Sequence, residues 1–289
     1  MTAIEQYVAP TSLEQAAEYL QRSGEVTILA GGTDLMPQSQ GGKLKIKRAL
    51  MNINHIPELQ GIAIDGGAMR IGALATITEI MQSELVKKHF PILIEACDHF
   101  ASDQIRNAAT LGGNVCNASP AGDMLVPLLV LDAEVELASK PNGSLTRRCL
   151  PLAEFFVGPG KTRLVPAELL AGLRIALPDA NRYAYFFKFG TRPALDISTI
   201  SIGIAGTLKD GALSQVRVAF GAVAPVPMRA PRTEQALEGR RLDAASIEAV
   251  ACAARDEVTP IDDIRASAWY RKELIHNITK RMLDHVAQT

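Results

Sequence analysis

The amino-acid sequence predicts an α+β protein with two domains. Strand-like and helix-like segments are mixed along the chain without strict alternation. The turn Pro178-Asp-Ala-Asn181 separates a first part rich in glycine loops from a second part with longer strands and fewer such loops. With 289 residues, the chain is long enough for two modest domains. We therefore expect one domain over residues 1–178 and another over residues 179–289.

The composition is that of an ordinary globular chain without a strong electrostatic preference. Hydrophobic residues make up 47% of the sequence, and the 30 basic residues nearly balance the 31 acidic ones. A net charge of −1 gives no long-range attraction to nucleic acid or to an anionic membrane. The N-terminus lacks a signal-sequence pattern, and no apolar run approaches the roughly 20 residues of a membrane helix. We expect a cytoplasmic protein without membrane insertion or a nucleic-acid partner.

The cysteines and histidines show none of the spacings typical of metal sites. The four cysteines include no C-x-x-C pair, which argues against zinc or an iron–sulfur cluster held by this chain alone. The five histidines show no H-E-x-x-H pattern. We therefore predict reduced thiols, structural or surface histidines and no metal site, for Cys97, Cys116, Cys149, Cys252, His55, His89, His99, His276 and His285.

A helix and a strand open the chain. Thr11-Ser-Leu-Glu14 has the form of a capping box, and apolar residues then recur at helical spacing until Gly24 ends the helix. Glu25–Ala30 predicts a buried strand, which runs into the glycine-rich stretch Ile28–Met36. The polar, basic segment Gln38–Lys47 fits either an approach to phosphate or a solvent-exposed loop.

Short strands and a capped helix follow. Leu50–Asn54, Gly61–Ile64 and Met69–Ile71 have the composition of short strands separated by turns. Thr76, with Glu79 three positions later, predicts a helix that begins with a capping box. Strands therefore precede helices in this part of the chain.

The segment Asn107–Asp123 is a second glycine-rich stretch, and a helix after Pro91 leads into it. Gly112-Gly113 lets the backbone approach a ligand where any Cβ would collide. Short polar side chains surround this pair, namely Thr110, Asn114 and Asp123. A turn between core elements explains one such stretch about as well. Two such glycine-rich stretches, however, can together bind a single extended anion.

The rest of the first domain has its own apolar core. Met124–Leu131 is almost wholly apolar and predicts a buried segment. Gly158-Pro-Gly-Lys-Thr-Arg163 resembles a phosphate loop but lacks the G-x-x-x-x-G-K-[ST] spacing, so we reject a P-loop. The other expected elements are strands at Ala133–Ala138 and Leu169–Leu177 and a short helix at Leu152–Phe156.

The second domain is predicted to be a small sheet covered by helices. Its strand candidates contain long apolar runs, and Asp210-Gly211 predicts a hairpin turn between the last two. The expected strands are Tyr183–Phe189, Ser198–Leu208 and Ser214–Val223, and the expected helices are Ala244–Val258 and Ala268–Val286.

Four sequence blocks in one order resemble a known family. They are AGGTDL at residues 30–35, TLGGN…SPAGD at residues 110–123, KTRL at residues 161–164 and KFGTRPALDIS at residues 188–198. Together they resemble the FAD-binding medium subunit of molybdenum hydroxylases, the family of xanthine dehydrogenase and aerobic carbon monoxide dehydrogenase. The resemblance implies an FAD-binding domain of the vanillyl-alcohol-oxidase (PCMH) type, with two lobes split near residues 55–60. A C-terminal α+β domain of the CO-dehydrogenase flavoprotein type would follow.

The resemblance also implies which residues bind FAD. The backbone of both glycine-rich stretches would wrap the pyrophosphate and ribityl chain, Asp123 would bond a polar group, and Lys188 would donate toward the flavin. The implied residues are Leu29, Ala30, Gly31, Gly32, Thr33, Asp34, Leu35, Phe100, Thr110, Leu111, Gly112, Gly113, Asn114, Asp123, Leu164 and Lys188.

Several of these residues also fit ordinary structural roles. Phe100 on a helical face fits the core, and Asp123 before an apolar segment fits a helix cap or turn. Lys188 fits a surface lysine at a strand end. Arg192, Asp196 and Ile197 belong to the same block as Lys188, and we do not assign them to the site.

The resemblance implies an electron-transfer role without a catalytic side chain on this chain. A large subunit would hold the molybdopterin and choose the substrate, and a small subunit would hold two [2Fe–2S] clusters. This chain would pass their electrons through FAD to NAD, oxygen or a quinone, in a dimer of heterotrimers. Substrates ranging from purines, aldehydes and N-heterocycles to carbon monoxide and aromatic acids stay open. A stand-alone NAD(P)H-dependent flavoenzyme and a non-catalytic assembly subunit are the alternatives.

Overall fold

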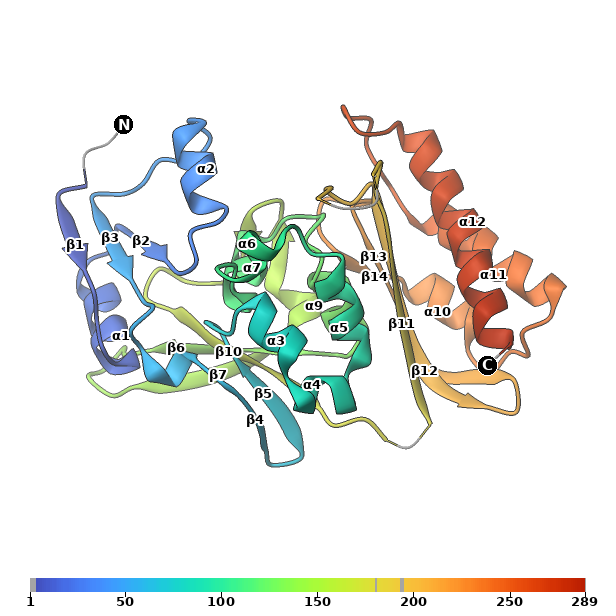
Figure 1. The fold of residues 1–289 in the computed structure, drawn as a ribbon, viewed down its shortest axis with the longest axis horizontal. Helices are drawn as coiled ribbons and strands as arrows, with labels where there is room; N and C mark the ends of the chain where they lie inside the picture. The colour runs from blue at the N-terminus through green and yellow to red at the C-terminus, as the bar shows by residue number, and fades with distance from the viewer. Residues whose placement is uncertain (1–3, 180, 193–194, 289) are drawn as a thin grey trace.

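The computed structural model describes residues 4–179, 181–192 and 195–288. Its sheets follow one another along the long axis of the molecule, from an N-terminal sheet at one end to a layer of C-terminal helices at the other (Figure 1). Helices and strands are mixed along the chain without strict alternation. The α+β class expected from the sequence is therefore confirmed.

A parallel sheet forms the N-terminal end of the molecule. Its strands, in spatial order, are β1 (Gln6–Val8), β3 (Ala49–Asn52) and β2 (Val26–Leu29). Helix α1 (Leu13–Arg22) connects β1 to β2 and buries Leu13, Ala16 and Leu20 in a core shared with Met51 of β3. The 3.6-residue spacing of these apolar side chains is the pattern that predicted the helix.

The cap of α1 differs from the expected one. Ser12 is the N-cap, and its hydroxyl accepts a hydrogen bond from the Gln15 backbone N–H at 3.2 Å. The Gln15 side chain in turn accepts a bond from the Thr11 backbone N–H at 3.0 Å. The capping box expected from Thr11 and Glu14 is therefore wrong by one residue. The helix begins at Leu13, whose side chain is fully buried.

A five-stranded antiparallel sheet occupies the centre. Its strands, in spatial order, are β4 (Ile62–Asp65), β5 (Ala68–Gly72), β10 (Leu169–Ala176), β6 (Glu134–Ser139) and β7 (Thr146–Pro151). Strand β10 therefore lies in the middle, although it comes last in the chain. The helical segments between β5 and β6 pack on this sheet.

Short helices cover the central sheet. The capping box predicted at Thr76 and Glu79 is confirmed, because the Thr76 hydroxyl accepts from Glu79 N–H at 3.1 Å and the Glu79 carboxylate accepts from Thr76 N–H at 2.7 Å. The helices are α3 (Ile77–Gln82), α4 (Glu84–His89), α5 (Pro91–Asp98), α6 (Asp103–Arg106), α7 (Leu111–Asn117), α8 (Leu125–Val130) and α9 (Leu152–Phe155).

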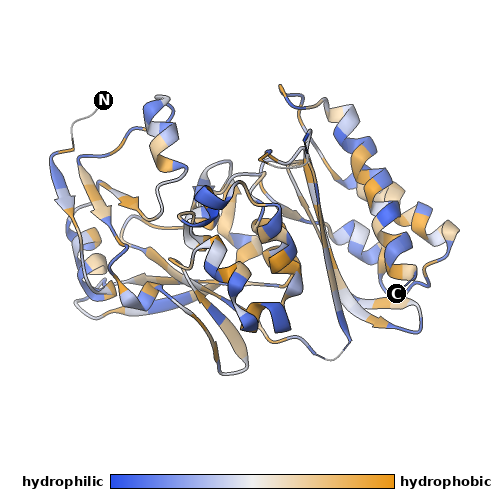
Figure 2. Ribbon diagram, in the orientation of Figure 1, coloured by the Kyte–Doolittle hydropathy of each residue, from blue (hydrophilic) through white to orange (hydrophobic). Residues whose placement is uncertain are grey.

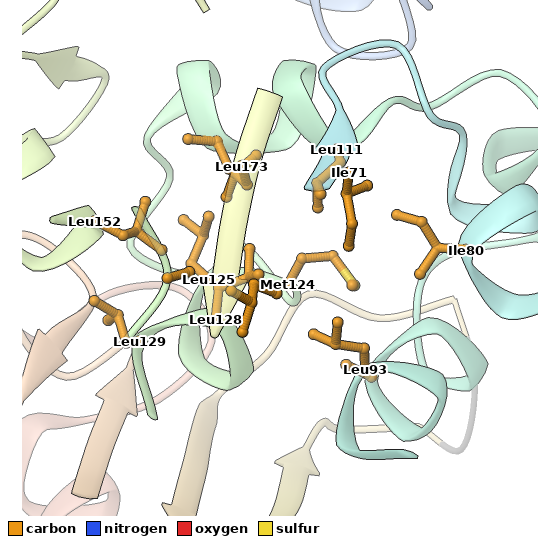
Figure 3. Close-up of a cluster of buried hydrophobic side chains, with 14 of the residues drawn as sticks. Ile71, Ile80, Leu93, Leu111, Met124, Leu125, Leu128, Leu129, Leu152 and Leu173 are labelled. Atoms are coloured by element: carbon orange, nitrogen blue, oxygen red, sulfur yellow. The ribbon is translucent and has the colours of Figure 1, made fainter. Parts of the chain in front are cut away.

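The largest apolar core lies between these helices and the sheet. Figure 3 shows Leu93 of α5 and Met124, just before α8, pointing toward Ile71 of β5 and Leu173 of β10. All four side chains are fully buried. The apolar segment after Asp123 is thus buried, as its composition indicated, and the structure shows that it forms a helix.

Short elements complete the first part of the chain. The polar segment Gln38–Lys47, for which an approach to phosphate and an exposed loop were both open, begins inside a helix. The Met36 and Gln38 N–H groups bond the Gly32 and Asp34 carbonyls there. These short elements are α2 (Leu35–Gln40), the 3-10 helix η1 (Pro57–Leu59) and the paired strands β8 (Phe156–Gly158) and β9 (Lys161–Thr162).

The C-terminal part is an antiparallel sheet with helices on one face, as predicted. In Figure 1 this sheet stands between the central helices and the last three helices. The strands, in order, are β11 (Arg182–Phe189), β12 (Ile200–Lys209), β13 (Ala212–Gly221) and β14 (Met228–Arg229). The helices are α10 (Pro231–Leu237), α11 (Ala244–Glu257) and α12 (Ala268–Ala287).

Strand β12 presents large side chains to one face of the sheet and small ones to the other. Ile200, Ile202 and Ile204 join the core under the C-terminal helices. On the opposite face, a Cβ on Gly203 would lie 3.0 Å from a Val126 methyl group of α8. The sheet backbone can therefore approach α8 closely.

Helix α12 is amphipathic, and Figure 2 shows hydrophilic and hydrophobic residues alternating along it. Its buried face includes Ile275, Met282 and Leu283, which pack in the apolar core between the C-terminal sheet and its helices. Within the described part of the chain, no helix has both the length and the apolar character needed to cross a membrane.

Candidate functional site

The two glycine-rich stretches lie in direct contact. A Cβ placed on Gly31 would lie only 1.7 Å from the carbonyl oxygen of Ala108. Any side chain at residue 31 would therefore separate the stretches. Gly32 adopts a φ of +69°, the left-handed region that favours glycine. The fold thus brings together two segments that are far apart in the sequence.

The first stretch offers unpaired backbone donors. Residues 31–34 lie between β2 and α2, and Gly31, Gly32 and Thr33 are half-buried. Among the described residues, no acceptor is found for the N–H groups of residues 31–34. Successive N–H groups around a left-handed residue form a concave anion-binding surface. This stretch can therefore hold a phosphate without a basic side chain.

The other predicted residues of this stretch are placed around these donors. Leu29 ends β2 and Leu35 begins α2, and both are half-buried. The Ala30 carbonyl accepts a hydrogen bond from the Asn54 side chain at 3.1 Å. The exposed Asp34 carboxylate accepts one from the Gln38 side chain at 2.7 Å. These contacts fix the ends of the turn and leave its N–H groups open.

The second stretch is a helix start rather than an open loop. Thr110 is the N-cap of α7, and Gly112 is buried whereas Gly113 is exposed. A Cβ on Gly112 would lie 2.7 Å from the Ala73 carbonyl oxygen. The N–H groups here are already bonded: Leu111 to Ala75 O at 2.9 Å, Gly112 to Ala73 O at 2.8 Å, Gly113 to Thr110 Oγ1 at 3.0 Å and Asn114 to Thr110 O at 3.0 Å. This stretch therefore offers side chains rather than backbone donors.

Asn114 carries an unpaired buried oxygen. Its Oδ1 atom is shielded from solvent and has no hydrogen-bond partner among the described residues. An unsatisfied buried acceptor costs roughly 1–3 kcal/mol. Nearby, the Gln38 side chain reaches Asn117 of the same helix at 3.4 Å, which links α2 to α7. The Asn114 oxygen thus has an unused capacity to accept a hydrogen bond.

A buried ion pair lies beyond α7. Asp123 Oδ2 accepts a bond from Lys188 Nζ at 2.8 Å, and Oδ1 accepts one from the Ser198 hydroxyl at 2.8 Å. Lys188 Nζ also donates to the His99 carbonyl at 2.9 Å. Burial raises the pKa of the Asp123 carboxyl, while Lys188 and Ser198 act in the opposite direction. These contacts fix the Lys188 ammonium group.

The helix-cap role considered for Asp123 is wrong. The N-cap of α8 is Met124, and it makes no side-chain capping bond. Both Asp123 oxygens bond side chains of the C-terminal sheet region instead. The surface role considered for Lys188 is also wrong, because only 6% of its side chain is exposed.

A hollow of about 440 Å³ lies beside the Lys188–Asp123 pair. Asp196 is one of its lining residues, and its carboxylate accepts bonds from Thr191 N–H, the Thr191 hydroxyl and Arg192 N–H. The Thr191 hydroxyl is the main reason that the pKa of Asp196 is lowered. The described lining residues are His99, Phe187, Lys188, Phe189, Gly190, Thr191, Arg192, Leu195 and Asp196.

The hollow includes residues that the sequence did not assign to a site. His99, Arg192 and Asp196 line it beside Lys188. Arg192 and Asp196 belong to the KFGTRPALDIS block, so the block itself was the available signal. His99 had no such signal, since it comes from the end of α5 and meets Lys188 only through the fold.

Phe100 and Leu164 lie against the core. The Phe100 side chain is 8% exposed and belongs to the largest apolar core, between the central sheet and its helices. Leu164 is half-buried and packs against the same core. Their contact with a cofactor stays a prediction, while the contact of the two glycine-rich stretches and the Asp123–Lys188 pair are features of the fold.

Comparison with known proteins identifies the family. The family described as "FAD binding domain in molybdopterin dehydrogenase" matches residues 2–179, and that described as "CO dehydrogenase flavoprotein C-terminal domain" matches residues 185–286. The chain is 34% identical over 280 residues to the putative xanthine dehydrogenase FAD-binding subunit of Escherichia coli K12, covering 96% of this chain and 94% of the relative. It is 31% identical to the glyceraldehyde dehydrogenase medium chain of Sulfolobus acidocaldarius, covering 97% and 98%.

A solved structure agrees with these matches. A carbon monoxide dehydrogenase chain from Hydrogenophaga pseudoflava superposes with a TM-score of 0.91 and 29% identity, covering 97% of this chain and 96% of that chain. The resemblance noted in the sequence is thus confirmed over nearly the whole chain. The chain therefore belongs to the FAD-binding medium subunits of the molybdenum hydroxylase family of oxidoreductases.

Proposed function

We propose that this chain passes electrons from the [2Fe–2S] clusters of a partner subunit, through its FAD, to an external acceptor such as NAD, oxygen or a quinone. A third, molybdopterin-binding subunit would oxidise the substrate, in a dimer of heterotrimers. Relatives named as a medium chain and as an FAD-binding subunit support this arrangement. The boundary between the FAD-binding and C-terminal domains would lie near residues 178–179, and the two lobes would divide near residues 55–60.

The observation that carries the proposal is the contact between the two glycine-rich stretches. The open N–H groups of residues 31–34 suit the FAD pyrophosphate. The buried, unpaired Oδ1 of Asn114 suits a hydroxyl or N–H group of the cofactor. The unpaired N–H donors and the unpaired oxygen acceptor therefore suit a cofactor that carries both phosphate oxygens and hydroxyl or N–H groups, as FAD does. The exposed Gly113 would leave room for the cofactor beside the α7 backbone.

The hollow beside Lys188 suits the flavin ring. FAD supplies the redox chemistry when bound, since its ring accepts electrons singly or in pairs. Lys188 would present a fixed positive charge there, because Asp123 and the His99 carbonyl hold its ammonium group. A nearby cation favours the reduced, anionic ring over the oxidised, neutral one. The chain would thus contribute position and electrostatics, and no nucleophile or acid–base pair.

Purification of the chain together with its partner subunits tests the proposal. We expect one FAD per chain, and bleaching of the flavin absorbance when the substrate of the complex is added under anaerobic conditions. Removal of the iron–sulfur subunit should abolish this bleaching. An isolated chain whose flavin is reduced directly by NAD(P)H would instead support a stand-alone flavoenzyme. Turnover that continues after FAD is removed would leave only an assembly role.

A further inference from the structure

Three side chains of different chemistry converge where α11 packs against α12, on the outer side of the C-terminal sheet. Glu248 and Cys252 lie one helical turn apart on α11, and His276 lies on α12. Their potential ligand atoms all lie within 4.8 Å of one another. All three residues are half-buried, with 13% of the His276 side chain and 47% of the Glu248 side chain exposed.

The separations of these atoms approach those of a tetrahedral metal site. Glu248 Oε1 lies 2.9 Å from His276 Nε2 and 3.6 Å from Cys252 Sγ. Cys252 Sγ lies 3.9 Å from His276 Nε2. Ligands bonded at about 2.0 to 2.3 Å to a tetrahedral zinc ion are about 3.3 to 3.8 Å apart. Shifts of a fraction of an ångström would therefore bring all three atoms into coordination distance.

Lys280 orients the carboxylate of this cluster. It lies one turn beyond His276 on α12 and pairs with Glu248 Oε2. The other oxygen, Oε1, is the one that faces Cys252 and His276. Outer contacts of this kind commonly fix the orientation of metal-binding carboxylates. Lys280 can therefore keep its ion pair while Oε1 faces a metal.

An ordinary ion-pair cluster explains only part of this arrangement. Glu248 between His276 and Lys280 is a common contact on packed helices. The position of Cys252 is different, because a thiol is a weak hydrogen-bond donor and gains little from facing an ion pair. A thiolate is, however, a strong ligand for zinc.

We propose that Glu248, Cys252 and His276 bind one Zn²⁺ ion, with a water molecule in the fourth position. The combination of sulfur, nitrogen and oxygen ligands suits zinc, whereas magnesium and calcium require oxygen ligands. Binding would release the Cys252 thiol proton and join α11 to α12. The sequence does not reveal this site, because Cys252 and His276 are 24 residues apart on separate helices.

Metal binding by the full-length chain, purified with its partner subunits, tests this site. After removal of metals in the presence of a phosphine reductant, we expect one equivalent of Zn²⁺ to be retained on desalting. Co²⁺ added in place of Zn²⁺ should give the ultraviolet charge-transfer band of a thiolate–cobalt bond. Zinc should also raise the melting temperature of the chain.

Variants distinguish this site from other thiols. Cys252→Ala and His276→Ala should each weaken zinc binding by more than the roughly 10–100-fold expected for loss of an outer contact, and Cys252→Ala should remove the cobalt band. Cys149→Ala changes an exposed thiol on β7 and should leave both signals unchanged. Circular dichroism checks that each variant is folded. Absence of zinc and cobalt binding by the unaltered chain, or a cobalt band that survives in folded Cys252→Ala, would overturn the proposal.

Discussion

Asp123 and Lys188 form an ion pair that joins the segment before α8 to strand β11, with Oδ2 and Nζ 2.8 Å apart. Only 13% of the Asp123 side chain and 6% of the Lys188 side chain are exposed. The pair therefore links the helices over the central sheet to the C-terminal sheet at the edge of the hollow.

Replacement of Lys188 by methionine should destabilise the chain strongly. The change leaves the Asp123 carboxylate buried without its cation, which costs about 3–5 kcal/mol of unfolding free energy at neutral pH. Denaturant unfolding of the cofactor-free chain measures this loss. Lys87→Met, which removes an exposed pair with Glu84, is the control and should cost less than about 1 kcal/mol. Equal losses in both variants would contradict a buried ion pair.

The loss of unfolding free energy caused by Lys188→Met should be smaller in acid. Burial already raises the pKa of Asp123 above its unfolded value, and removal of Lys188 raises it further. The folded state then binds its proton more tightly than the unfolded state does. The contribution of Asp123 to stability is full below its unfolded pKa and is lost as the pH rises through its folded pKa. The deficit of Lys188→Met should therefore be larger at pH 8 than at pH 5.

Lys188 should also influence the reduction potential of FAD. If its fixed charge favours the reduced ring, Lys188→Met should shift the two-electron potential to more negative values, by about 30 mV for each 1.4 kcal/mol of lost stabilisation. Lys188→Arg keeps the charge and should retain most of the potential. Anaerobic titration with a reference dye measures the shift. An unchanged potential in folded, FAD-loaded Lys188→Met would place the flavin away from this hollow.

Asn114→Ala should have opposite effects on FAD affinity and on the stability of the cofactor-free chain. The Oδ1 atom is unpaired, so its removal should leave the unfolding free energy unchanged or increase it slightly. Loss of the proposed bond between Asn114 and the cofactor should weaken FAD binding by about tenfold. Calorimetric titration of the apoprotein and thermal unfolding provide the two measurements. Unaltered affinity would show that Asn114 does not contact FAD.

Gly31→Ala should lower both FAD binding and the stability of the cofactor-free chain. The new Cβ would overlap the Ala108 carbonyl oxygen and separate the two glycine-rich stretches. We expect a loss of about 1–3 kcal/mol in stability together with a loss of bound FAD. Gly24→Ala is the matched control, because a Cβ there meets no atom within 4 Å, and it should change stability by less than about 0.5 kcal/mol. Normal FAD content in Gly31→Ala would argue against this contact as the cofactor site.

Glu95 should make the chain less stable in alkaline than in mildly acidic solution. Its carboxylate accepts a bond from the Phe186 backbone N–H at 3.1 Å, and burial raises its pKa. A raised folded pKa means that stability is lost as the pH rises through that value. Glu95→Gln retains an acceptor for Phe186 without the charge, so its unfolding free energy should exceed that of the unaltered chain at pH 8. This advantage should shrink toward pH 4.

Local patterns predicted most of the secondary structure. The capping box at Thr76 and Glu79 contains both of its side-chain contacts within four residues, and the helical spacing of the Leu13 face is equally local. The second glycine-rich stretch was different. Two adjacent glycines disfavour a helix, but the carbonyls of Ala73 and Ala75 accept N–H groups from α7 and stabilise it. Those contacts depend on the tertiary fold.

The arrangement of the candidate site depends still more on contacts between residues that are far apart in the sequence. Gly31 needs to be glycine because of Ala108, and the position of Lys188 depends on Asp123, yet no short sequence window contains either pair. Similarity to a family pointed to Gly31, Asp123 and Lys188, though not to Ala108, without giving the physical reason. The convergence of Glu248, Cys252 and His276 belonged to no family block and was missed altogether.

The alternation of side chains along β12 has a mechanical consequence. Its isoleucines belong to the core under α11 and α12, while Ala205 on its other face belongs to the core over the central sheet. One sheet is therefore the shared wall of two apolar cores, and Gly203 keeps that wall tight against α8. Hinge bending that pulled this wall away from α8 would expose the apolar core over the central sheet. We therefore expect the central sheet, its covering helices and the C-terminal sheet to move as one rigid body.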